Sequence, residues 1–125
     1  MQLDPSLFEA HYNLGLVAAE TGNLPLALRA YETALALEPS SNDARYNFAL
    51  VLKRANCPRD AVNELEKIVA HSPNETRAHL ALGNLYAQQL KQPTRAPQHY
   101  LKVIELEPQH PHASALNFWL ASPHP

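Results

Sequence analysis

The tripeptide Leu-Glu-Pro stands at residues 37–39 and again at 106–108, and the related tripeptides Leu-Asp-Pro and His-Ser-Pro stand at 3–5 and 71–73. The prolines of these four tripeptides follow one another at spacings of 34, 34 and 35 residues. A fixed period in this range is typical of a stack of repeated supersecondary units. The chain of 125 residues therefore holds about three repeats, and a stack of this kind favours binding over catalysis.

Apolar and small residues recur at fixed places when the repeats are started at Phe8, Asn42 and Thr76. Within each half of a repeat these places lie three or four residues apart, so they share one face of a helix. Small residues recur at the eighth and twentieth places, where a short distance between two helix axes needs a small side chain. The recurring residues are Leu14, Gly15, Ala18, Ala27 and Tyr31 in repeat 1, Phe48, Ala49, Leu52, Ala61 and Leu65 in repeat 2, and Leu82, Gly83, Tyr86, Ala96 and Tyr100 in repeat 3.

Turn and capping residues divide each repeat into two helices. Pro25, Pro58 and Pro93 lie near the starts of second helices, where a missing N–H is tolerated. Gly22 and Asn56 precede two of them and accept a left-handed backbone. We expect helices at about 7–20, 24–37, 42–54, 58–71, 76–90, 94–107 and 111–121, and no strands.

Two further local features are predicted from the same alignment of repeats. Ser40, Ser41 and Asn74 can cap the first helices of the later repeats. One extra residue between Leu90 and Ala96 should lengthen the turn of repeat 3.

The periodic pattern also predicts where the repeats begin and end. We expect the tail of a truncated upstream repeat at 1–7, repeats at 8–41, 42–75 and 76–110, and a capping helix with a frayed tail at 111–125. A terminal repeat needs a capping element with one polar, solvent-exposed face. The alternative for the last segment is a truncated fourth repeat. The beginning suggests either a piece of a longer array or a natural short N-terminus. With little of an upstream repeat present, Leu7, Ala10 and Leu14 should be exposed, which favours end-to-end self-association.

Composition excludes several classes of function. A net charge of −2 gives no broad attraction to nucleic acid or to acidic membranes, so we expect neither as a partner. The single cysteine, Cys57, excludes an intrachain disulfide and a cysteine metal cluster. The sequence shows no apolar run long enough to span a bilayer and no signal peptide, so a cytoplasmic location is expected.

The repeated pattern resembles the tetratricopeptide repeat, whose signature is Trp-x2-Leu-Gly-x2-Tyr, then Ala-x3-Phe, then Pro. The resemblance covers residues 3–110 in three consecutive units, with His11, Arg45 and His79 at the place of the Trp. We expect His11 and His79 to be packing residues. It implies an all-α fold, a right-handed superhelical solenoid of antiparallel helix pairs. It also implies that the first helices line a concave groove that binds peptides or helices of partner proteins.

The groove-facing places of the family give the candidate binding residues. They combine an apolar floor, side-chain amides and a basic cluster: Tyr12, Asn13, Leu16, Tyr46, Asn47, Leu50, Lys53, Arg54, Arg77, Leu80 and Asn84. An exposed apolar strip rimmed by charge is suited to a protein partner. In the alternative interpretation the tyrosines only pack between neighbouring helices.

These residues partly match one known binding mode of the family and do not match another. Asn13 and Asn47 resemble two rungs of the asparagine ladder in O-linked N-acetylglucosamine transferase, although Asn is ordinary at this place and the ladder stops at Ala81. The carboxylate clamp of co-chaperones is rejected, because Tyr12 and Leu16 stand where it needs Lys and Asn.

The sequence therefore predicts a non-enzymatic protein-interaction scaffold without cofactor or metal. Its ligand should be a protein or peptide with apolar anchors and acidic residues. The close pair His110 and His112 lacks further ligands for a metal, and Cys57 has no orienting base. Two alternatives remain open: a repeat fragment, excised or engineered, that serves mainly as a structural or self-assembling element, and the regulatory repeat region of a larger enzyme.

Overall fold

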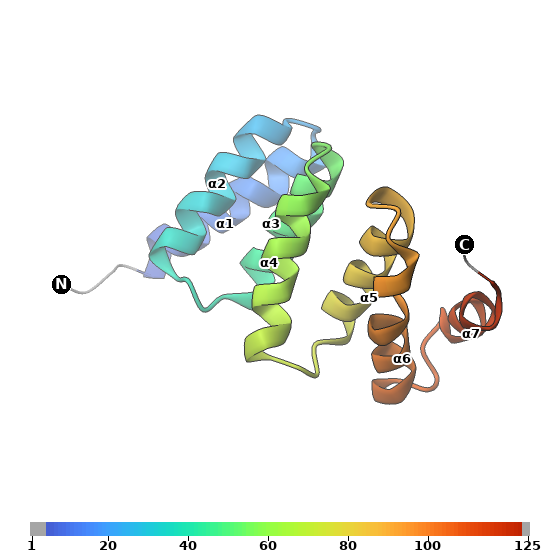
Figure 1. Ribbon diagram of the computed structural model, residues 1–125. Helices are drawn as coiled ribbons and strands as arrows, with labels where there is room; N and C mark the ends of the chain where they lie inside the picture. The colour runs from blue at the N-terminus through green and yellow to red at the C-terminus, as the bar shows by residue number, and fades with distance from the viewer. Residues whose placement is uncertain (1–4, 124–125) are drawn as a thin grey trace. The chain divides into compact units, whose positions relative to one another are not determined.

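The structure, a computed structural model, describes residues 5–123, and all the regular secondary structure in that range is helical (Figure 1). The α-helices are α1 (Pro5–Glu20), α2 (Leu24–Leu37), α3 (Asn42–Arg54), α4 (Pro58–His71), α5 (Thr76–Asn84), α6 (Pro97–Leu106) and α7 (Ala113–Ala121). A π-helical turn, η1 (Leu85–Gln89), and a 3₁₀ turn, η2 (Pro93–Arg95), lie between α5 and α6. The predicted all-α class is therefore confirmed.

The bounds of α2, α3 and α4 match the predicted ranges, whereas the other four α-helices differ. The first helix begins at Pro5 rather than residue 7, as the first turn of a helix tolerates proline. The last helix begins at Ala113 rather than residue 111, after a turn through Pro111 and His112. The predicted helix at 76–90 is wrong in its last turn, which is π-helical. The helix predicted to start at residue 94 begins at Pro97, after η2.

The chain divides into two compact units, Met1–Glu64 and Leu65–Pro125. In the first unit α1 packs along α2, and α2 packs on α3. Tyr31 of α2 is almost fully buried and lies directly over Gly15 of α1, where an added Cβ would stand 2.6 Å from the ring atom Cε1. The close approach of α1 and α2 therefore depends on glycine at this place.

In the second unit α5 packs along α6, and α7 packs on α6. Tyr100 of α6 covers Gly83 of α5 as Tyr31 covers Gly15, and an added Cβ would stand 2.4 Å from the Cε1 atom of Tyr100. Ala27, Ala61 and Ala96, at the predicted small place of the second helices, are all fully buried. The predicted pattern of small residues is thus explained by close packing within the repeats.

The extra residue of repeat 3 lies inside the π-helical turn rather than between Leu90 and Ala96. At corresponding places, the amide of Thr21 donates to Val17 O and that of Ala55 to Val51 O, each four residues back. In repeat 3 the amide of Leu90 donates five residues back, to Leu85 O. A π turn accommodates one more residue than an α turn, so the insertion leaves the following turn of the chain largely unchanged.

The turns that follow the first helices are alike in all three repeats. Gly22, Asn56 and Lys91 have φ angles of 84°, 64° and 53°. The next residue in each turn donates its amide to the same repeat place, at Ala18, Leu52 or Tyr86. Gly22 and Asn56 were predicted for this role, whereas a lysine gives no such signal in the sequence.

Helix capping differs between the repeats. Ser41 accepts a hydrogen bond from the amide of Ala44 at 3.2 Å and caps α3, as predicted. The prediction that Asn74 caps α5 is wrong, because the N-cap residue is Glu75, whose side chain makes no capping hydrogen bond.

Leu7, Ala10 and Leu14 on α1 are exposed, as expected. The predicted upstream tail falls partly on residues 1–4 and the predicted frayed end partly on 124–125, which lie outside the described residues.

Candidate functional site

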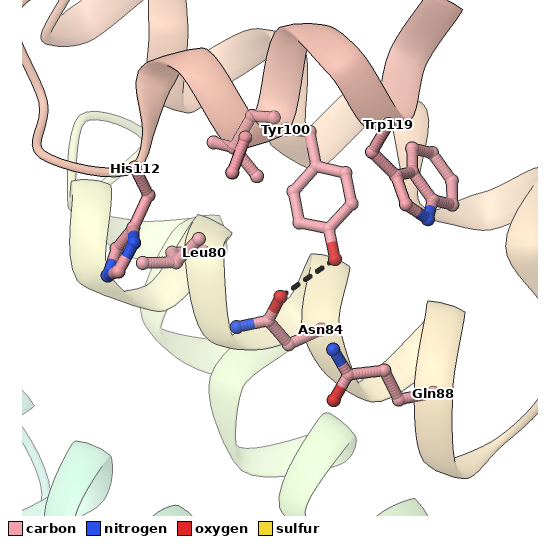
Figure 2. Close-up of a pocket in the computed structure, with 8 residues that line it drawn as sticks. Leu80, Asn84, Gln88, Tyr100, His112 and Trp119 are labelled. Carbon is pink, nitrogen blue, oxygen red and sulfur yellow. Dashed lines mark hydrogen bonds between the residues drawn. The ribbon is translucent and has the colours of Figure 1, made fainter. Parts of the chain in front are cut away.

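A cavity of about 220 Å³ opens in the second unit between α5, η1, α6 and α7 (Figure 2). Its walls combine aliphatic and aromatic side chains with two amides and one imidazole: Leu80, Asn84, Gln88, Tyr100, His112, Ala115, Leu116 and Trp119. A concave site with mostly apolar walls and a few polar groups is the usual form of a ligand pocket. Leu80 and Asn84, both predicted groove residues, are therefore brought together in one cavity.

Four of the eight residues that line the cavity lie on α7 or just before it. None of these four is among the binding residues predicted from the sequence. Continuing the repeat numbering from Pro111 places His112, Ala115, Leu116 and Trp119 at the same groove-facing places that Arg77, Leu80, Ala81 and Asn84 hold in repeat 3. The repeat spacing therefore does predict these positions as binding residues, but a segment interpreted as a cap gives no reason to include them. The helix that was expected to cap repeat 3 thus also lines the cavity.

Tyr100 connects the core of the second unit to the cavity. Its hydroxyl donates to Asn84 Oδ1 at 2.7 Å, and its ring meets Trp119 edge to face with 5.0 Å between centroids. Burial raises the pKa of Tyr100, so the hydroxyl remains a donor at neutral pH. Because Asn84 accepts through Oδ1, its Nδ2 group is the part of the amide that can donate to a ligand.

In the first unit the predicted residues form a surface along α1 and α3. Tyr12 is half-buried, stacks on Phe8 with 5.8 Å between centroids, and accepts a hydrogen bond from Asn47 Nδ2 at 2.9 Å. This bond ties the first helices of repeats 1 and 2 together. Asn47 therefore has a packing role that the ladder hypothesis did not include. Asn13 is exposed.

The apolar residues of the same surface are partly accessible. Leu16 is 38% exposed, whereas Tyr46 and Leu50 are half-buried. The ring of Tyr31 lies next to that of Tyr12, with 6.1 Å between centroids. Burial, with a smaller contribution from Tyr12, raises the pKa of Tyr31 to about 12. The first unit thus offers a surface of aromatic and aliphatic side chains.

The three predicted basic residues differ in their surroundings. The guanidinium of Arg54 donates to the carbonyl of Ala19 at 2.9 Å, and Lys53 beside it is half-buried. Arg77, in the second unit, pairs with Glu75 at 3.1 Å. A guanidinium has five donors, so Arg54 keeps donors for a ligand after its bond to Ala19.

Residues 5–123 also include histidines and a cysteine outside these two surfaces. No group of three or more His, Cys, Asp or Glu side chains there could hold a metal ion. The Nδ1 atom of His110 accepts a hydrogen bond from the backbone amide of His112 at 3.0 Å. The thiol of Cys57 lies 3.7 Å from the carbonyl oxygen of Ala55. None of the described helices has the length and apolar character needed to cross a membrane.

Antiparallel helix pairs with a 34-residue period, joined at buried small residues, define a helical-repeat protein. Family models of the tetratricopeptide repeat match residues 8–41 and 46–111, and the chain belongs to the tetratricopeptide repeat family. The match confirms the resemblance drawn from the three consecutive signatures.

Two curated relatives contain similar segments. The protein O-mannosyl-transferase Tmtc3 of Drosophila melanogaster is 26% identical over 100 residues, which are 80% of this chain and 11% of Tmtc3. The cytochrome c-type biogenesis protein CcmH of Escherichia coli (strain K12) is 37% identical over 60 residues, which are 48% of this chain and 17% of CcmH. The chain thus spans less than one fifth of the length of either relative.

Solved structures share the fold. YrrB, a TPR protein with an unusual peptide-binding site, superposes with a TM-score of 0.81 at 22% identity, over 89% of this chain and 57% of YrrB. The first TPR of Spaghetti (RPAP3), bound to the HSP90 peptide SRMEEVD, has a TM-score of 0.79 at 22% identity, over 98% of this chain and 99% of that chain. At this level of identity the likeness shows the fold.

Proposed function

We propose that the chain is a non-catalytic protein-interaction module whose first helices bind an extended segment of a partner protein. The observation that carries this proposal is the open cavity of the second unit, which has apolar walls and two amides at one rim. An apolar side chain of the partner fits the walls, while Asn84 and Gln88 can each donate to and accept from a peptide backbone. YrrB and the RPAP3 domain support the proposal, because both are described with peptide-binding sites or bound peptides.

The first unit offers a surface of its own for a partner segment. Tyr12, Leu16, Tyr46 and Leu50 offer apolar contact, and buried aromatic contacts dominate the energy of most interfaces. Lys53, Arg54 and Arg77 favour acidic residues in the ligand, and they act mainly on its orientation and association rate. The preferred ligand is therefore a segment with apolar anchors and acidic residues.

Selection from a random peptide library tests this proposal. Trp119 is the only tryptophan of the chain and lines the cavity, so its fluorescence reports occupancy directly. We expect saturable binding of apolar and acidic peptides, weakened by Leu80→Ser. Leu101→Ser, on the exposed face of α6, is the matched control and should leave the affinity unchanged. Equal affinity of both variants would contradict the proposed cavity.

The first unit is tested by Tyr46→Ala, which should weaken binding of a selected peptide by about 2 kcal/mol if Tyr46 is an anchor. Changing Lys53 and Arg54 to Glu should mainly slow association, most clearly at low salt. An unchanged association rate would exclude a basic rim. Calorimetry and stopped-flow fluorescence measure the two effects separately.

A second candidate function is that of the repeat region of a larger enzyme. The matched Drosophila protein is an O-mannosyl-transferase, and the chain corresponds to 11% of it. Under this alternative the module presents a partner or substrate to a catalytic domain elsewhere in the same polypeptide. Saturable peptide binding by the 125-residue chain alone favours the first candidate, and binding only after fusion to a catalytic domain favours the second.

Self-association is a further part of the proposal. Leu7, Ala10, Leu14 and Val17 lie three or four residues apart and form an exposed strip on α1. A second copy of the chain is the proposed partner, since interior repeats bury such strips against their neighbours. Light scattering should show a mass that rises with concentration, and Leu14→Lys should abolish the rise. A monomeric mass at every concentration would contradict end-to-end association.

A further inference from the structure

Two histidines from different helices meet inside the second unit. His79 of α5 and His99 of α6 are only 8% and 6% exposed. Their Nδ1 atoms are 3.1 Å apart, and their ring centroids are separated by 5.4 Å. The sequence analysis predicted that His79 is a packing residue, and its burial agrees with that role. A hydrogen bond between two imidazoles adds chemistry that simple packing does not require.

The surrounding acceptors fix which nitrogens carry protons. His79 Nε2 lies 2.8 Å from the carbonyl oxygen of Pro73, and only an N–H can bond to a carbonyl. In the neutral ring the Nδ1 atom of His79 is therefore the acceptor, and His99 must donate to it through Nδ1–H. This leaves the Nε2 atom of His99 as an unprotonated, buried nitrogen that makes no hydrogen bond.

Charged and polar groups face this nitrogen from each neighbouring element. Glu66 of α4 places Oε1 at 3.7 Å from His99 Nε2. Tyr86 of η1 stacks on the His99 ring with 5.9 Å between centroids, and its hydroxyl donates to the same Glu66 oxygen at 3.2 Å. Arg95 of η2 lies 5.9 Å from the Tyr86 centroid.

Two more ion pairs belong to these helices. Glu75 and Arg77 pair at the start of α5, and Lys102 and Glu105 pair on α6. Burial, followed by the Glu66 carboxylate, raises the pKa of Tyr86, so the tyrosine stays a donor to Glu66 throughout the neutral and acidic range. The group that faces His99 Nε2 is thus the Glu66 carboxylate, which also accepts the hydrogen bond from Tyr86.

Repeat 2 uses the same two places for a different pair. Arg45 and Glu64 stand at the places of His79 and His99, and they form a salt bridge of 2.7 Å. The guanidinium of Arg45 also donates to the carbonyl of Pro39 at 2.7 Å, as His79 does to Pro73. Both pairs connect the first and second helices of a repeat and hold the preceding proline carbonyl. Unlike a guanidinium and a carboxylate, which carry charges at neutral pH, the paired imidazoles are neutral there, and imidazole is a group that can take up a proton in acid.

We propose that the His79–His99 pair is a pH-sensitive contact between α5 and α6 that holds the second unit together at neutral pH and weakens it in mild acid. The inference does not depend on the proposed binding function. A first proton at His99 Nε2 places a charge in a buried site, with Glu66 as its counterion. A second proton at His79 Nδ1 turns two N–H groups toward each other and breaks the hydrogen bond between the rings.

The direction of the effect follows from the native and unfolded states. Burial, followed by the neighbouring His79, lowers the pKa of His99 from 6.5 to about 4. Between these values the unfolded chain binds a proton that the folded chain excludes, so stability falls as the pH falls from about 6.5 to about 4. The contribution is fully present above the unfolded value.

The experiment is equilibrium unfolding in urea at pH 5 and pH 7, followed by Trp119 fluorescence, which reports on the second unit. From pH 7 to pH 5 the unfolding equilibrium constant of the wild-type chain should rise about 20-fold more than that of His99→Asn. The asparagine keeps a donor near the Nδ1 position but cannot be protonated. His71→Gln, at an exposed position of α4, is the control and should behave as wild type.

A transplant of the repeat 2 pair sharpens the same experiment. His79→Arg combined with His99→Glu should reduce the pH dependence to that of His99→Asn, since a guanidinium–carboxylate pair stays charged from pH 5 to pH 7. Equal pH dependence of wild type and His99→Asn would overturn the proposal.

A second measurement needs no variant. Nitrogen-15 NMR of the imidazoles at pH 7 should show His79 protonated at Nε2 and His99 protonated at Nδ1. On lowering the pH, His99 should begin to titrate well below 6.5, the ordinary pKa of a histidine. Either the opposite tautomers or a normal titration of His99 would also overturn the proposal.

Discussion

Repeats 2 and 3 hold their helix pairs together at the same two places with different chemistry. In repeat 2 a guanidinium and a carboxylate meet at 2.7 Å, and their side chains are only 15% and 14% exposed. In repeat 3 two imidazoles meet at 3.1 Å. Each pair also binds the carbonyl of the proline that precedes the repeat. The repeat thus fixes the geometry of the contact, whereas the residues chosen decide under which conditions it is stable.

The largest expected effect tests the repeat 2 pair. Arg45→Met should reduce the free energy of unfolding of the chain by about 3 kcal/mol at pH 7, since it leaves the Glu64 carboxylate without its guanidinium. The double variant Arg45→Met/Glu64→Leu should recover much of this loss, because both charges are then removed. Urea unfolding measures both. A loss below about 1 kcal/mol for the single variant would place this pair among weak surface ion pairs.

The packing of the helix pairs offers a second comparison. Repeats 1 and 3 combine a glycine with a tyrosine, Gly15 with Tyr31 and Gly83 with Tyr100, whereas repeat 2 has Ala49 and Leu65 at these places. Gly83→Ala should destabilise by about 2 kcal/mol, since its Cβ would overlap the ring of Tyr100.

Matched controls separate this overlap from helix propensity. In a Tyr100→Leu background the clash is absent, and Gly83→Ala should instead stabilise by up to about 1 kcal/mol, the helix preference of alanine over glycine. A double-mutant cycle of urea unfolding curves gives the coupling between the two positions. Additive effects would contradict the role assigned to Gly83.

Much of this fold was predictable from periodicity because the repeated features are local. The apolar spacing, the small residues at helix crossings and the turn residues Gly22 and Asn56 are signals that a short window contains. They predicted three of the seven described α-helices to the residue. The π turn at η1 was not predictable, because one inserted residue can enter a helix or a loop at similar cost, and only the hydrogen bonds distinguish the two.

The site was less predictable than the fold, for a related reason. Leu80 and Asn84 followed from the repeat pattern, but the opposite wall of the cavity comes from α7 and from Tyr100, whose residues were assigned to a cap and to the core. The pairing of His79 with His99 depends on the register of repeat 3, which the insertion obscured. The repeat pattern therefore did not predict side-chain contacts between segments that are far apart in the sequence.

Helix capping gives a smaller contrast between the same two repeats. Ser41→Ala should cost about 1 kcal/mol, because it removes the acceptor for the Ala44 amide at the start of α3. Glu75→Ala at the start of α5 should cost less than about 0.5 kcal/mol, since Glu75 makes no capping bond and its pair with Arg77 is partly exposed. Thermal unfolding of both variants measures the difference, and equal losses would show that the caps are equivalent.

The smallest expected effect concerns the insertion. Deleting Gln89, an exposed residue of η1, should convert the π turn to an ordinary α turn and leave the urea midpoint nearly unchanged. Deleting Thr94 in η2 instead should lower the midpoint clearly, because no extra residue lies there. The reverse order would place the insertion between Leu90 and Ala96 after all.

Amide hydrogen exchange with and without a library-selected peptide tests the proposed function most directly. If the first helices and the cavity bind the partner segment, exchange should slow in α5, η1 and α7 of the second unit and along α1 and α3 of the first. Protection confined to α2, α4 and α6, with α5 and α7 unchanged, would contradict the proposed binding surface.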